Sequence, residues 1–467
     1  MDVKEVQLSH TLTNKDFRID SQYHTQKLIK NAKLEYKKIN DILVKAQYGI
    51  SIAMNELAIG YPIYRMNEIH NMLCDQDVAK FVDITQDELK VFTLNDRDVI
   101  FNRTNSIEWV GRTGIYRKLD QRDFVFASYL VRFIPNEEFI LPEYLTCFLN
   151  SKYGVLDLKR RARQSVNQAN INPEEVKAIE IPMLPLNFQD RLKNIFDIAY
   201  EQGVNSKQLY QDAEGSLLNE LGLLNYQPST EHISVKSFSD SFGNSGRLDA
   251  EYYQPKYECY FEKITEYSKG YTLIKDEFIH NTLKSTKSKD GYFYIEIRDV
   301  NIEDGSSHPN YVETLDLPAN AKIEACKSDL LISKVRPYRG AVCVIESDVD
   351  NLIVSGAFTV LRNKPDSVFS VEVLKVLLRT TVYKDWLLKF NVGTSYPVIK
   401  DIDVLNLPIP KIPEIMQADI VTKVKESQQL KAQSIHLLEV AKRAVEIVIE
   451  ENEQVALEYI TTETNSN

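Results

Sequence analysis

The feature of this 467-residue sequence that most constrains its fold is an internal repeat. Residues 181–189 read IPMLPLNFQ and residues 409–417 read IPKIPEIMQ, so two prolines, an isoleucine and a glutamine match at an offset of 228. Upstream, FRIDSQY (17–23) matches GRLDAEY (246–252) in its arginine, aspartate and tyrosine at an offset of 229. Matching anchors at both ends predict two copies of one structural plan.

Between these anchors, each copy has the pattern of a mixed α+β domain. Short runs rich in β-branched and aromatic residues indicate strands, and one helical segment follows them in each copy, at 143–164 and 371–390. The predicted strands are 61–66, 98–103 and 124–133 in the first copy and 292–297, 329–335 and 352–362 in the second. We therefore expect an α+β fold with two globular domains.

A long segment of helical periodicity follows each proline-rich joint. In the second copy the spacing alternates between four and three, as in a coiled-coil seam, at Leu430, Ser434, Leu437, Ala441, Ala444 and Val448. The stripe in the first copy is less regular, and Gly203 and Gly215 are expected to weaken it. Two such stripes favour two antiparallel helices packed as one stalk. The alternative is a surface helix docked on its own domain.

These patterns predict five segments along the chain. They are a first globular domain at 1–185, a first long helix with its linker at 186–230, a second globular domain at 231–411, a second long helix at 412–457 and a flexible tail at 458–467. Pro185 and Pro413 lie directly before the helices, where the fixed φ of proline suits a first turn. The stiff joints are expected to fix how each domain projects from the helices.

Several kinds of catalytic site have no motif in this sequence. We find no P-loop, no H-E-x-x-H, no G-x-S-x-G, no N-P-P-[YF] or D-P-P-[YF], and no C-x-x-C among the five cysteines. Scattered cysteines, the lack of a long apolar run and a start without signal-peptide character predict a soluble cytoplasmic protein. We expect a chain with no catalytic centre and no bound metal.

The net charge of −11 argues against a nucleic-acid partner until its distribution is considered. Residues 186–245 hold 4 basic and 8 acidic residues, and residues 412–467 hold 5 and 10, which leaves only −2 for the rest of the chain. The globular domains therefore have room for basic faces.

Three basic clusters are candidate DNA contacts. Loops that place guanidinium groups beside glycine and aromatic residues suit phosphate contacts and bidentate recognition of guanine. A solvated helix end and exposed hairpin tips with ordinary surface charge are the alternatives. The candidates are Arg103, Arg112 and Arg117; Lys159, Arg160 and Arg163; and Lys334, Arg336, Tyr338 and Arg339.

Together these features resemble the specificity subunit of type I restriction-modification systems. The resemblance covers nearly the whole chain. It is carried by the joints IPMLPLNFQDRL and IPKIPEIMQADIV, the openings FRIDSQY and GRLDAEYYQPKY, and the segments DVIFNRTNSIEWVGRTGIY and DLLISKVRPYRGAVCVI. It implies a non-catalytic DNA reader in which two target recognition domains each read half of an asymmetric bipartite sequence. It also implies that the two long helices act as the spacer between these domains.

The resemblance also implies partners and cofactors. The partners are double-stranded DNA, two copies of a DNA adenine methyltransferase (modification) subunit and a restriction subunit that translocates DNA. S-adenosylmethionine, ATP and magnesium belong to those subunits, and none belongs to this chain. Two other hypotheses remain open: a coiled-coil adaptor that presents two protein-binding domains without binding DNA, and an enzyme with a degenerate restriction or methyl-transfer site.

Overall fold

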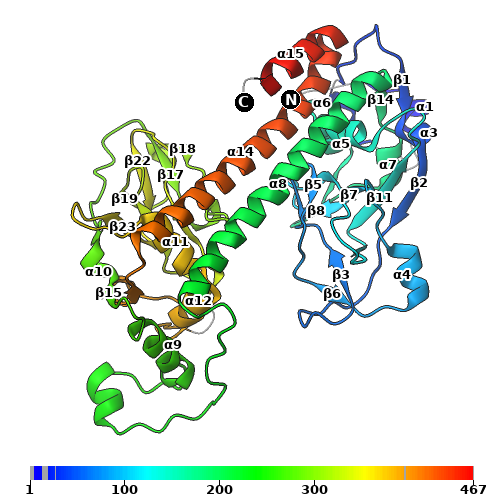
Figure 1. Cartoon of the computed structure of the whole chain (residues 1–467). Coiled ribbons are helices and arrows are strands. Elements are labelled where there is room, and N and C mark those ends of the chain that lie inside the picture. Colours follow the sequence, from blue (N-terminus) through cyan, green and yellow to red (C-terminus); the bar gives the residue numbers. More distant parts are fainter. Residues whose placement is uncertain (1–4, 13–18, 27, 394–395, 466–467) are drawn as a thin grey trace. The chain divides into compact units, whose positions relative to one another are not determined.

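The computed structural model describes residues 5–12, 19–26, 28–393 and 396–465. The chain divides into two compact units, Met1–Val204 with Leu430–Asn467, and Asn205–Gln429. Each unit combines one α+β body with one part of each of two long helices, α8 (Leu186–Glu220) and α14 (Glu414–Glu450) (Figure 1). The repeat predicted at FRIDSQY involves Arg18, which lies outside the described residues.

The body of the first unit is built on a six-stranded sheet in the order β2-β11-β7-β9-β5-β4. Strand β7 reads VIFN and is buried at all four positions, as expected of a strand covered on both faces. The sheets β10-β3-β6 and β12-β13-β8 and the pair β1-β14 complete the body. The strands are β1 Tyr36–Lys38, β2 Leu43–Tyr48, β3 Tyr61–Tyr64, β4 Ile69–His70, β5 Leu73–Cys74, β6 Phe81–Val82, β7 Val99–Asn102, β8 Thr104–Asn105, β9 Thr113–Ile115, β10 Val125–Phe126, β11 Leu130–Pro135, β12 Arg163–Gln164, β13 Ala169–Asn170 and β14 Glu180–Pro182.

The predicted helical segment at 143–164 is two helices in the structure. They meet at Ser151, whose hydroxyl accepts a hydrogen bond from the backbone N–H of Gly154 at 3.2 Å and so caps the second helix. Thr380 divides the segment at 371–390 in the same way, accepting from the N–H of Tyr383 at 3.4 Å. The helices of the first body are α1 Leu8–Leu12, α2 Ser21–Thr25, α3 Ile39–Ile42, α4 Gln86–Phe92, α5 Pro142–Asn150, α6 Lys152–Arg161 and α7 Pro173–Lys177.

The body of the second unit contains two four-stranded sheets, β16-β23-β20-β21 and β18-β17-β22-β19, and the pair β15-β24. Its strands are β15 Tyr271–Leu273, β16 Phe278–His280, β17 Gly291–Ile295, β18 Asn310–Glu313, β19 Ala321–Glu324, β20 Leu330–Ser333, β21 Val342–Val344, β22 Leu352–Ser355, β23 Phe358–Asn363 and β24 Pro408–Pro410. Its helices are η1 Ser239–Gly243, η2 Glu251–Tyr253, α9 Pro255–Thr265, α10 Ile274–Glu277, η3 Ile297–Asp299, η4 Thr314–Asp316, η5 Pro337–Arg339, α11 Val371–Arg379, α12 Thr381–Leu388 and α13 Asp401–Leu405.

The two bodies share one strand order, which confirms the predicted repeat. The run β2-β11-β7-β9 in the first body corresponds to β16-β23-β20-β21 in the second. The run β10-β3-β6 likewise corresponds to β22-β17-β18, and in both cases the first two strands pair in parallel and the last two antiparallel. Because matching strands have diverged in sequence, only the joints between them revealed the repeat.

The long helices pack antiparallel, as the periodicity predicted. In the first unit, Ser434 donates to the carbonyl of Ala199 at 2.6 Å. In the second unit, Ser206 and Ser427 each donate a hydroxyl to the other's carbonyl oxygen at 2.7 Å. Gly203 lies within the unbroken helix α8, so the expected weakening does not interrupt it. The alternative, in which a long helix docks on its own domain, also holds in part. Segments of both long helices contribute to the hydrophobic core of the body in their unit.

The structure explains why both joints carry a glutamine at the same position. Gln189 is fully buried on α8; its side-chain oxygen accepts from the N–H of Leu141 at 2.7 Å, and its amide donates to the carbonyls of Leu184 and Phe139 at 2.8 and 3.1 Å. The glutamine therefore ties the start of α5 and the proline joint to the start of α8.

Gln417 makes the same three contacts in the second unit. It accepts from the N–H of Ser370 at 2.7 Å and donates to the carbonyls of Ile412 and Val368 at 3.0 and 3.3 Å. The sequence repeat is thus a repeated clamp between each body and its long helix.

The predicted flexible tail at 458–467 is wrong as far as the structure describes it. Helix α14 ends at Glu450, and a separate helix, α15 (Glu453–Asn465), follows. Ala456 and Ile460 of α15 are buried in the core of the first unit. Apolar contacts at a spacing of four residues therefore continue the helical fold beyond the predicted boundary.

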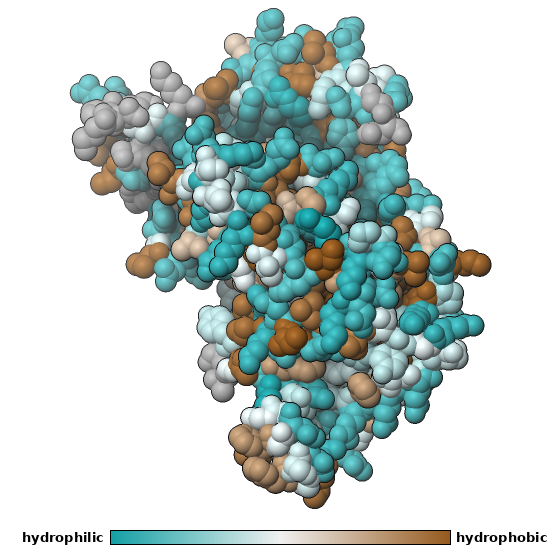
Figure 2. Space-filling view, turned by 90° about the vertical axis from the view of Figure 1, so that its left-hand side faces the viewer, coloured by the Kyte–Doolittle hydropathy of each residue, from teal (hydrophilic) through white to brown (hydrophobic). Residues whose placement is uncertain are grey.

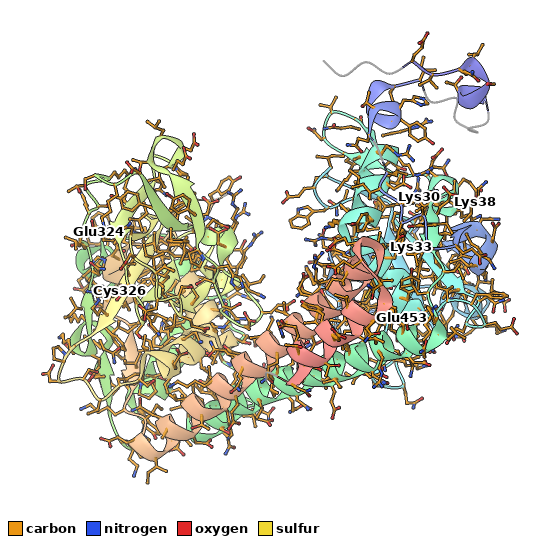
Figure 3. The ribbon with its side chains drawn as sticks, turned by 90° about the horizontal axis from the view of Figure 1, so that it is seen from above. Lys30, Lys33, Lys38, Glu324, Cys326 and Glu453 are labelled. Carbon is orange, nitrogen blue, oxygen red and sulfur yellow. The ribbon has the colours of Figure 1, made fainter. Side chains whose placement is uncertain are left out.

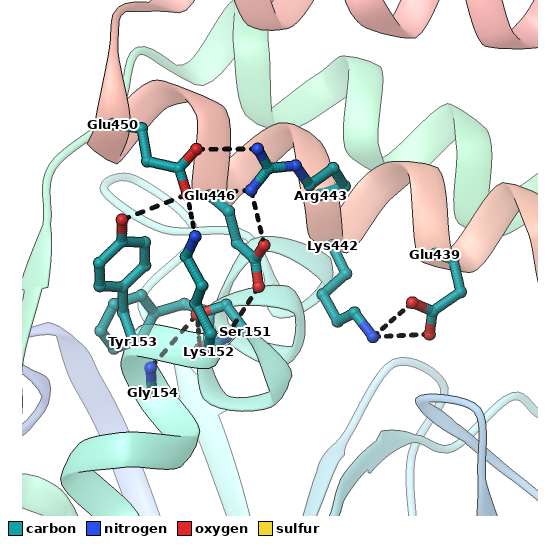
Figure 4. Close-up of polar contacts among 10 residues, drawn as sticks. Ser151, Lys152, Tyr153, Gly154, Glu439, Lys442, Arg443, Glu446 and Glu450 are labelled. Atoms are coloured by element: carbon teal, nitrogen blue, oxygen red, sulfur yellow. Dashed lines mark hydrogen bonds and ion pairs between the residues drawn. The ribbon is translucent and has the colours of Figure 1, made fainter.

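A polar network fixes the C-terminal part of α14 to the first body (Figure 4). Glu446 accepts from the backbone N–H of Lys152 at 2.8 Å, at the positive end of α6. Glu450 pairs with the side chains of Lys152 and Arg443, the latter at 2.8 Å, and accepts from the hydroxyl of Tyr153 at 3.3 Å. The pKa of Glu450 is lowered to about 2, chiefly by the hydrogen bond from Arg443.

Candidate nucleic-acid interface

In each unit a basic turn follows the central strand and lies beside a second segment. In the first unit we call residues 103–112 basic turn 1 and residues 163–170 side hairpin 1, and β8 of the turn pairs with β13 of the hairpin. In the second unit we call residues 334–340 basic turn 2 and residues 391–393 with 396–398 side segment 2, joined through the bridge between Val335 and Val398. The predicted basic clusters thus occupy corresponding places in the two bodies.

The side chain of Lys159 fixes the backbone of basic turn 1. The ammonium group donates to the carbonyls of Ile107, Glu108 and Val110, the last two at 2.9 and 3.1 Å. Burial is the main cause that lowers the pKa of Lys159. Lys159, predicted as a DNA contact, therefore positions the turn.

Arg112 is the last residue of basic turn 1, and its guanidinium group lies over the face of an indole ring. Its guanidinium carbon lies 3.4 Å from the ring centroid of Trp109, which is 42% exposed. The one hydrogen bond that its guanidinium makes among the described residues is a long contact of 3.4 Å to the carbonyl of Ile69. Burial lowers the pKa of the Arg112 guanidinium.

Two other arginines border the same turn. Arg103 lies over the ring of Tyr48 at 5.1 Å and donates to the side chain of Asn170 at 3.3 Å. Arg163 is exposed on β12 of side hairpin 1, and Val166 at the tip of this hairpin is 95% exposed. Turn and hairpin therefore form one surface of cations, amides and apolar groups.

Arg117 and Arg160 form ion pairs within the first unit. Arg117 pairs with Asp197 on α8 at 2.7 Å and with Asp96 at 3.3 Å. Arg160 pairs with Asp157 at 2.7 Å and donates to the carbonyl of Tyr23 at 3.1 Å. Their role as DNA contacts stays a prediction, and the geometry gives each of them a structural role.

Basic turn 2 contains one neutralised cation and three accessible candidates. Lys334 pairs with Asp401 at 3.0 Å. Arg336 has a left-handed backbone, with φ of 50°, and its guanidinium lies 4.5 Å from the ring of Tyr396. Tyr338 and Arg339 are exposed on η5.

Arg379 holds basic turn 2 as Lys159 holds basic turn 1. The buried guanidinium donates to the carbonyls of Gly340 at 3.1 Å and Ile302 at 3.0 Å, and to the hydroxyl of Tyr210 on α8 at 2.7 Å. The turn is thereby fixed to the helix segment of its own unit.

Sequence reasoning missed three residues of this surface. Trp109 and Tyr396 supply the rings on which the arginines stack, and Arg379 fixes the second turn. The only signal for Trp109 was its place beside Arg112, whereas Tyr396 and Arg379 lie 60 and 43 residues beyond Arg336 in the sequence. Such distant partners become visible only when the bridge between Val335 and Val398 is known.

No group of three metal-ligating side chains occurs in the part of the chain that was described, and no described helix is both long and apolar enough to cross a bilayer. Figure 2 shows hydrophobic residues scattered among hydrophilic ones on the face that it presents. Figure 3 labels Lys30 and Lys33, which precede β1, and Lys38, which ends this strand; Lys30 pairs with Glu180 at 2.5 Å.

Comparison with known families gives a match that lies in the first half of the chain. Residues 31–211 match the family model of the type I restriction modification DNA specificity domain. This stretch of the chain is therefore similar to a type I DNA specificity domain. This match includes basic turn 1, side hairpin 1 and most of α8. The second unit lies largely outside the matched residues, and its shared strand order relates it to the first.

Three curated relatives are similar over part of the chain. The putative type I restriction enzyme MjaX specificity subunit of Methanocaldococcus jannaschii is 28% identical over 163 residues, 34% of this chain and 38% of that protein. The EcoKI specificity subunit of Escherichia coli K12 is 33% identical over 100 residues, 21% and 22% of the two chains. The HindI specificity subunit of Haemophilus influenzae is 30% identical over 128 residues, 27% and 28%. The matches thus span well under half of these relatives.

Solved structures of specificity subunits align over most of the chain at low similarity. The S subunit from M. genitalium has 13% identity and a TM-score of 0.41, covering 93% of this chain and 98% of that one. The HsdS subunit from Thermoanaerobacter tengcongensis has 13% identity and a TM-score of 0.29, covering 91% and 98%. At these TM-scores the likeness carries no argument about function.

Proposed function

We propose that this chain is the DNA sequence-recognition subunit of a type I restriction-modification complex. In this proposal each unit reads one part of an asymmetric, two-part DNA sequence through its basic turn and the segment beside it. The chain supplies selectivity, and the chemistry belongs to the modification and restriction subunits that it holds.

One observation carries the proposal: the same framework presents a basic, aromatic turn in both units, but with different side chains. Basic turn 1 reads RTNSIEWVGR and basic turn 2 reads KVRPYRG. Side chains that differ on equal frameworks suit two different half-sites, because base edges are read by side chains and phosphates mainly position the protein. The target is therefore expected to be non-palindromic.

The proposed partners follow from the family of the first half. They are double-stranded DNA, two copies of an adenine methyltransferase subunit and a restriction subunit. S-adenosylmethionine, magnesium and ATP are expected to bind those subunits. The acidic excess of residues 186–245 and 412–467 disfavours DNA on the long helices and leaves their exposed faces for protein partners.

The test is to map methylated adenines in a host that carries this chain with its modification subunit. We expect one bipartite motif with two different halves. Replacing residues 246–405 by the equivalent segment of another specificity subunit is expected to change one half only. Loss of both halves contradicts separate reading by each unit.

A binding measurement separates this function from the adaptor hypothesis. The affinity of the chain with its modification subunit for a duplex is expected to fall steeply with salt, since neutralised phosphates release counterions. A complex that forms without any DNA affinity at low salt favours the adaptor. Turnover by the purified chain alone, with DNA, magnesium and labelled S-adenosylmethionine, favours the enzyme hypothesis.

A further inference from the structure

The predicted DNA contacts differ in whether a carboxylate neutralises the charge of the basic side chain. Arg117, Arg160 and Lys334 each have a carboxylate partner within 3.0 Å. Arg112 and Arg336 have no carboxylate within ion-pair distance in the described part of the chain, and each lies over an aromatic ring. One of these two stacked arginines lies in each unit. Arg103 also lies over a ring, that of Tyr48 at 5.1 Å, but its guanidinium donates to the side chain of Asn170 at 3.3 Å.

Stacking fixes the direction of a guanidinium group. When its plane is parallel to the ring, its N–H donors point outward from the edge as a flat fork. For Arg112, one donor makes the long contact to Ile69, and the others have no hydrogen-bond partner among the residues described. The donors are therefore available to an acceptor pair outside the protein.

The backbone beneath each stacked arginine is fixed as well. In basic turn 1, the N–H and carbonyl groups of Asn102 bond with Arg112 and Gly111 at 2.8 Å, while Lys159 binds the carbonyls at the tip. In basic turn 2, the N–H of Arg336 donates to the carbonyl of Pro397 at 2.8 Å. A fixed fork can discriminate between bases because small displacements would break a two-point contact.

The electrostatics also favour an external ligand. Arg112 is half-buried beside Trp109, and this burial lowers its pKa because it outweighs the opposite effect of the carboxylates of Glu108 and Asp75. A ligand that supplies hydrogen-bond acceptors stabilises the charged form of such a cation. Groups with perturbed pKa values of this kind are common at functional sites. A surface arginine that only binds phosphate needs neither a ring nor a fixed backbone.

We propose that Arg112, stacked on Trp109, and Arg336, stacked on Tyr396, each read one guanine through its O6 and N7 atoms, one in each half of the target. The fork of an arginine matches these two acceptors, which no other base presents together in the major groove. This inference rests on the proposed function of the chain as a DNA reader. It adds the base that each turn recognises and the residue that recognises it.

The test uses the full chain in complex with its modification subunit and a pool of duplexes with randomised sequence. Arg112→Gln is expected to reduce the preference for guanine at one position of one half-site by about 10- to 100-fold, with the other half-site unchanged. Arg336→Gln is expected to do the same in the other half-site. The matched controls are Arg122→Gln and Arg298→Gln, which remove exposed arginines paired with Asp120 and Glu296 in the two units.

Arg112→Lys distinguishes base reading from phosphate binding even if the glutamine variant folds poorly. It keeps the charge but loses the rigid fork, so we expect wild-type affinity for unrelated DNA and a weaker preference for guanine. Trp109→Leu is expected to reduce the same preference while the salt dependence stays as in wild type.

Two results overturn the guanine assignment. One is a preference for guanine that survives unchanged in Arg112→Gln. The other is a uniform loss of affinity for all sequences in Arg112→Gln, with the salt slope reduced by about one, which marks a phosphate contact. In both cases the wild-type complex still selects a DNA sequence. If the wild-type complex selects none, the proposed function itself fails.

Discussion

The buried glutamines at the two joints allow a quantitative test of how each body is attached to its helix. Gln189→Leu removes a side chain that bonds three backbone groups, on Leu141, Leu184 and Phe139. Leucine has a similar size but offers neither donor nor acceptor. The backbone groups that it leaves unpaired remain in place, because the apolar core around them is retained.

The expected cost follows from the burial of those groups. Leu141 and Leu184 are 8% and 5% exposed, so their N–H and carbonyl lose their partners without access to water. Each such loss costs about 1–3 kcal/mol. Phe139 is 43% exposed, and its carbonyl can bond water. We therefore expect the first unit to lose about 3 kcal/mol of stability, a shift in the urea midpoint of roughly 1–2 M.

Amide hydrogen exchange resolved along the chain is the appropriate assay, because two units need not unfold together. Gln189→Leu is expected to lower protection around residues 139–150 and 184–192, and Gln417→Leu around residues 368–380 and 412–420. Gln208→Ala, which changes an exposed glutamine on α8 bonded to Asp212 at 2.8 Å, is the control. A loss below about 0.5 kcal/mol, or equal loss of protection in both units, refutes the reasoning.

Three further predictions concern other parts of the molecule. Because the pKa of Glu450 is lowered from 4.5 to about 2, its contribution to stability is complete above about pH 4.5 and is lost as the pH falls toward 2. Urea midpoints at pH 5 and pH 3 should therefore differ more in wild type than in Glu450→Gln, and an equal difference contradicts the assignment. Lys159→Met removes the donor to three carbonyls and should speed amide exchange in residues 106–112, because the turn loses about 1–2 kcal/mol of local stability. Unchanged exchange in these residues shows that the lysine does not hold the turn. Leu217→Ala removes most of a fully buried side chain of α8 and should lower the free energy of unfolding of the second unit by about 2–5 kcal/mol, measured by chemical denaturation. A loss below about 1 kcal/mol shows that this helix segment is not part of that core.

The sequence predicted most of the framework for physical reasons that act locally. Strands such as β7 and β20 were visible because runs of β-branched and aromatic residues have no other compatible structure at that length. The seam of α14 was visible because Ser434, Ala441 and Ala444 recur at helical spacing. The break at Ser151 was missed, since a hydroxyl that caps a helix looks like any other polar residue until its N–H partner is known.

The sequence by itself determined that the chain is built twice on one plan, that each copy is α+β, and that two long helices pair. It did so because glutamine, proline and apolar spacing are set by neighbours along the chain. Only the tertiary structure decided which cations are neutralised and which are available. Asp197 lies 80 residues from Arg117, and Asp401 lies 67 residues from Lys334, so ion pairing depends on where folding brings distant carboxylates. The same folding leaves Arg112 and Arg336 against aromatic rings without an ion pair among the described residues.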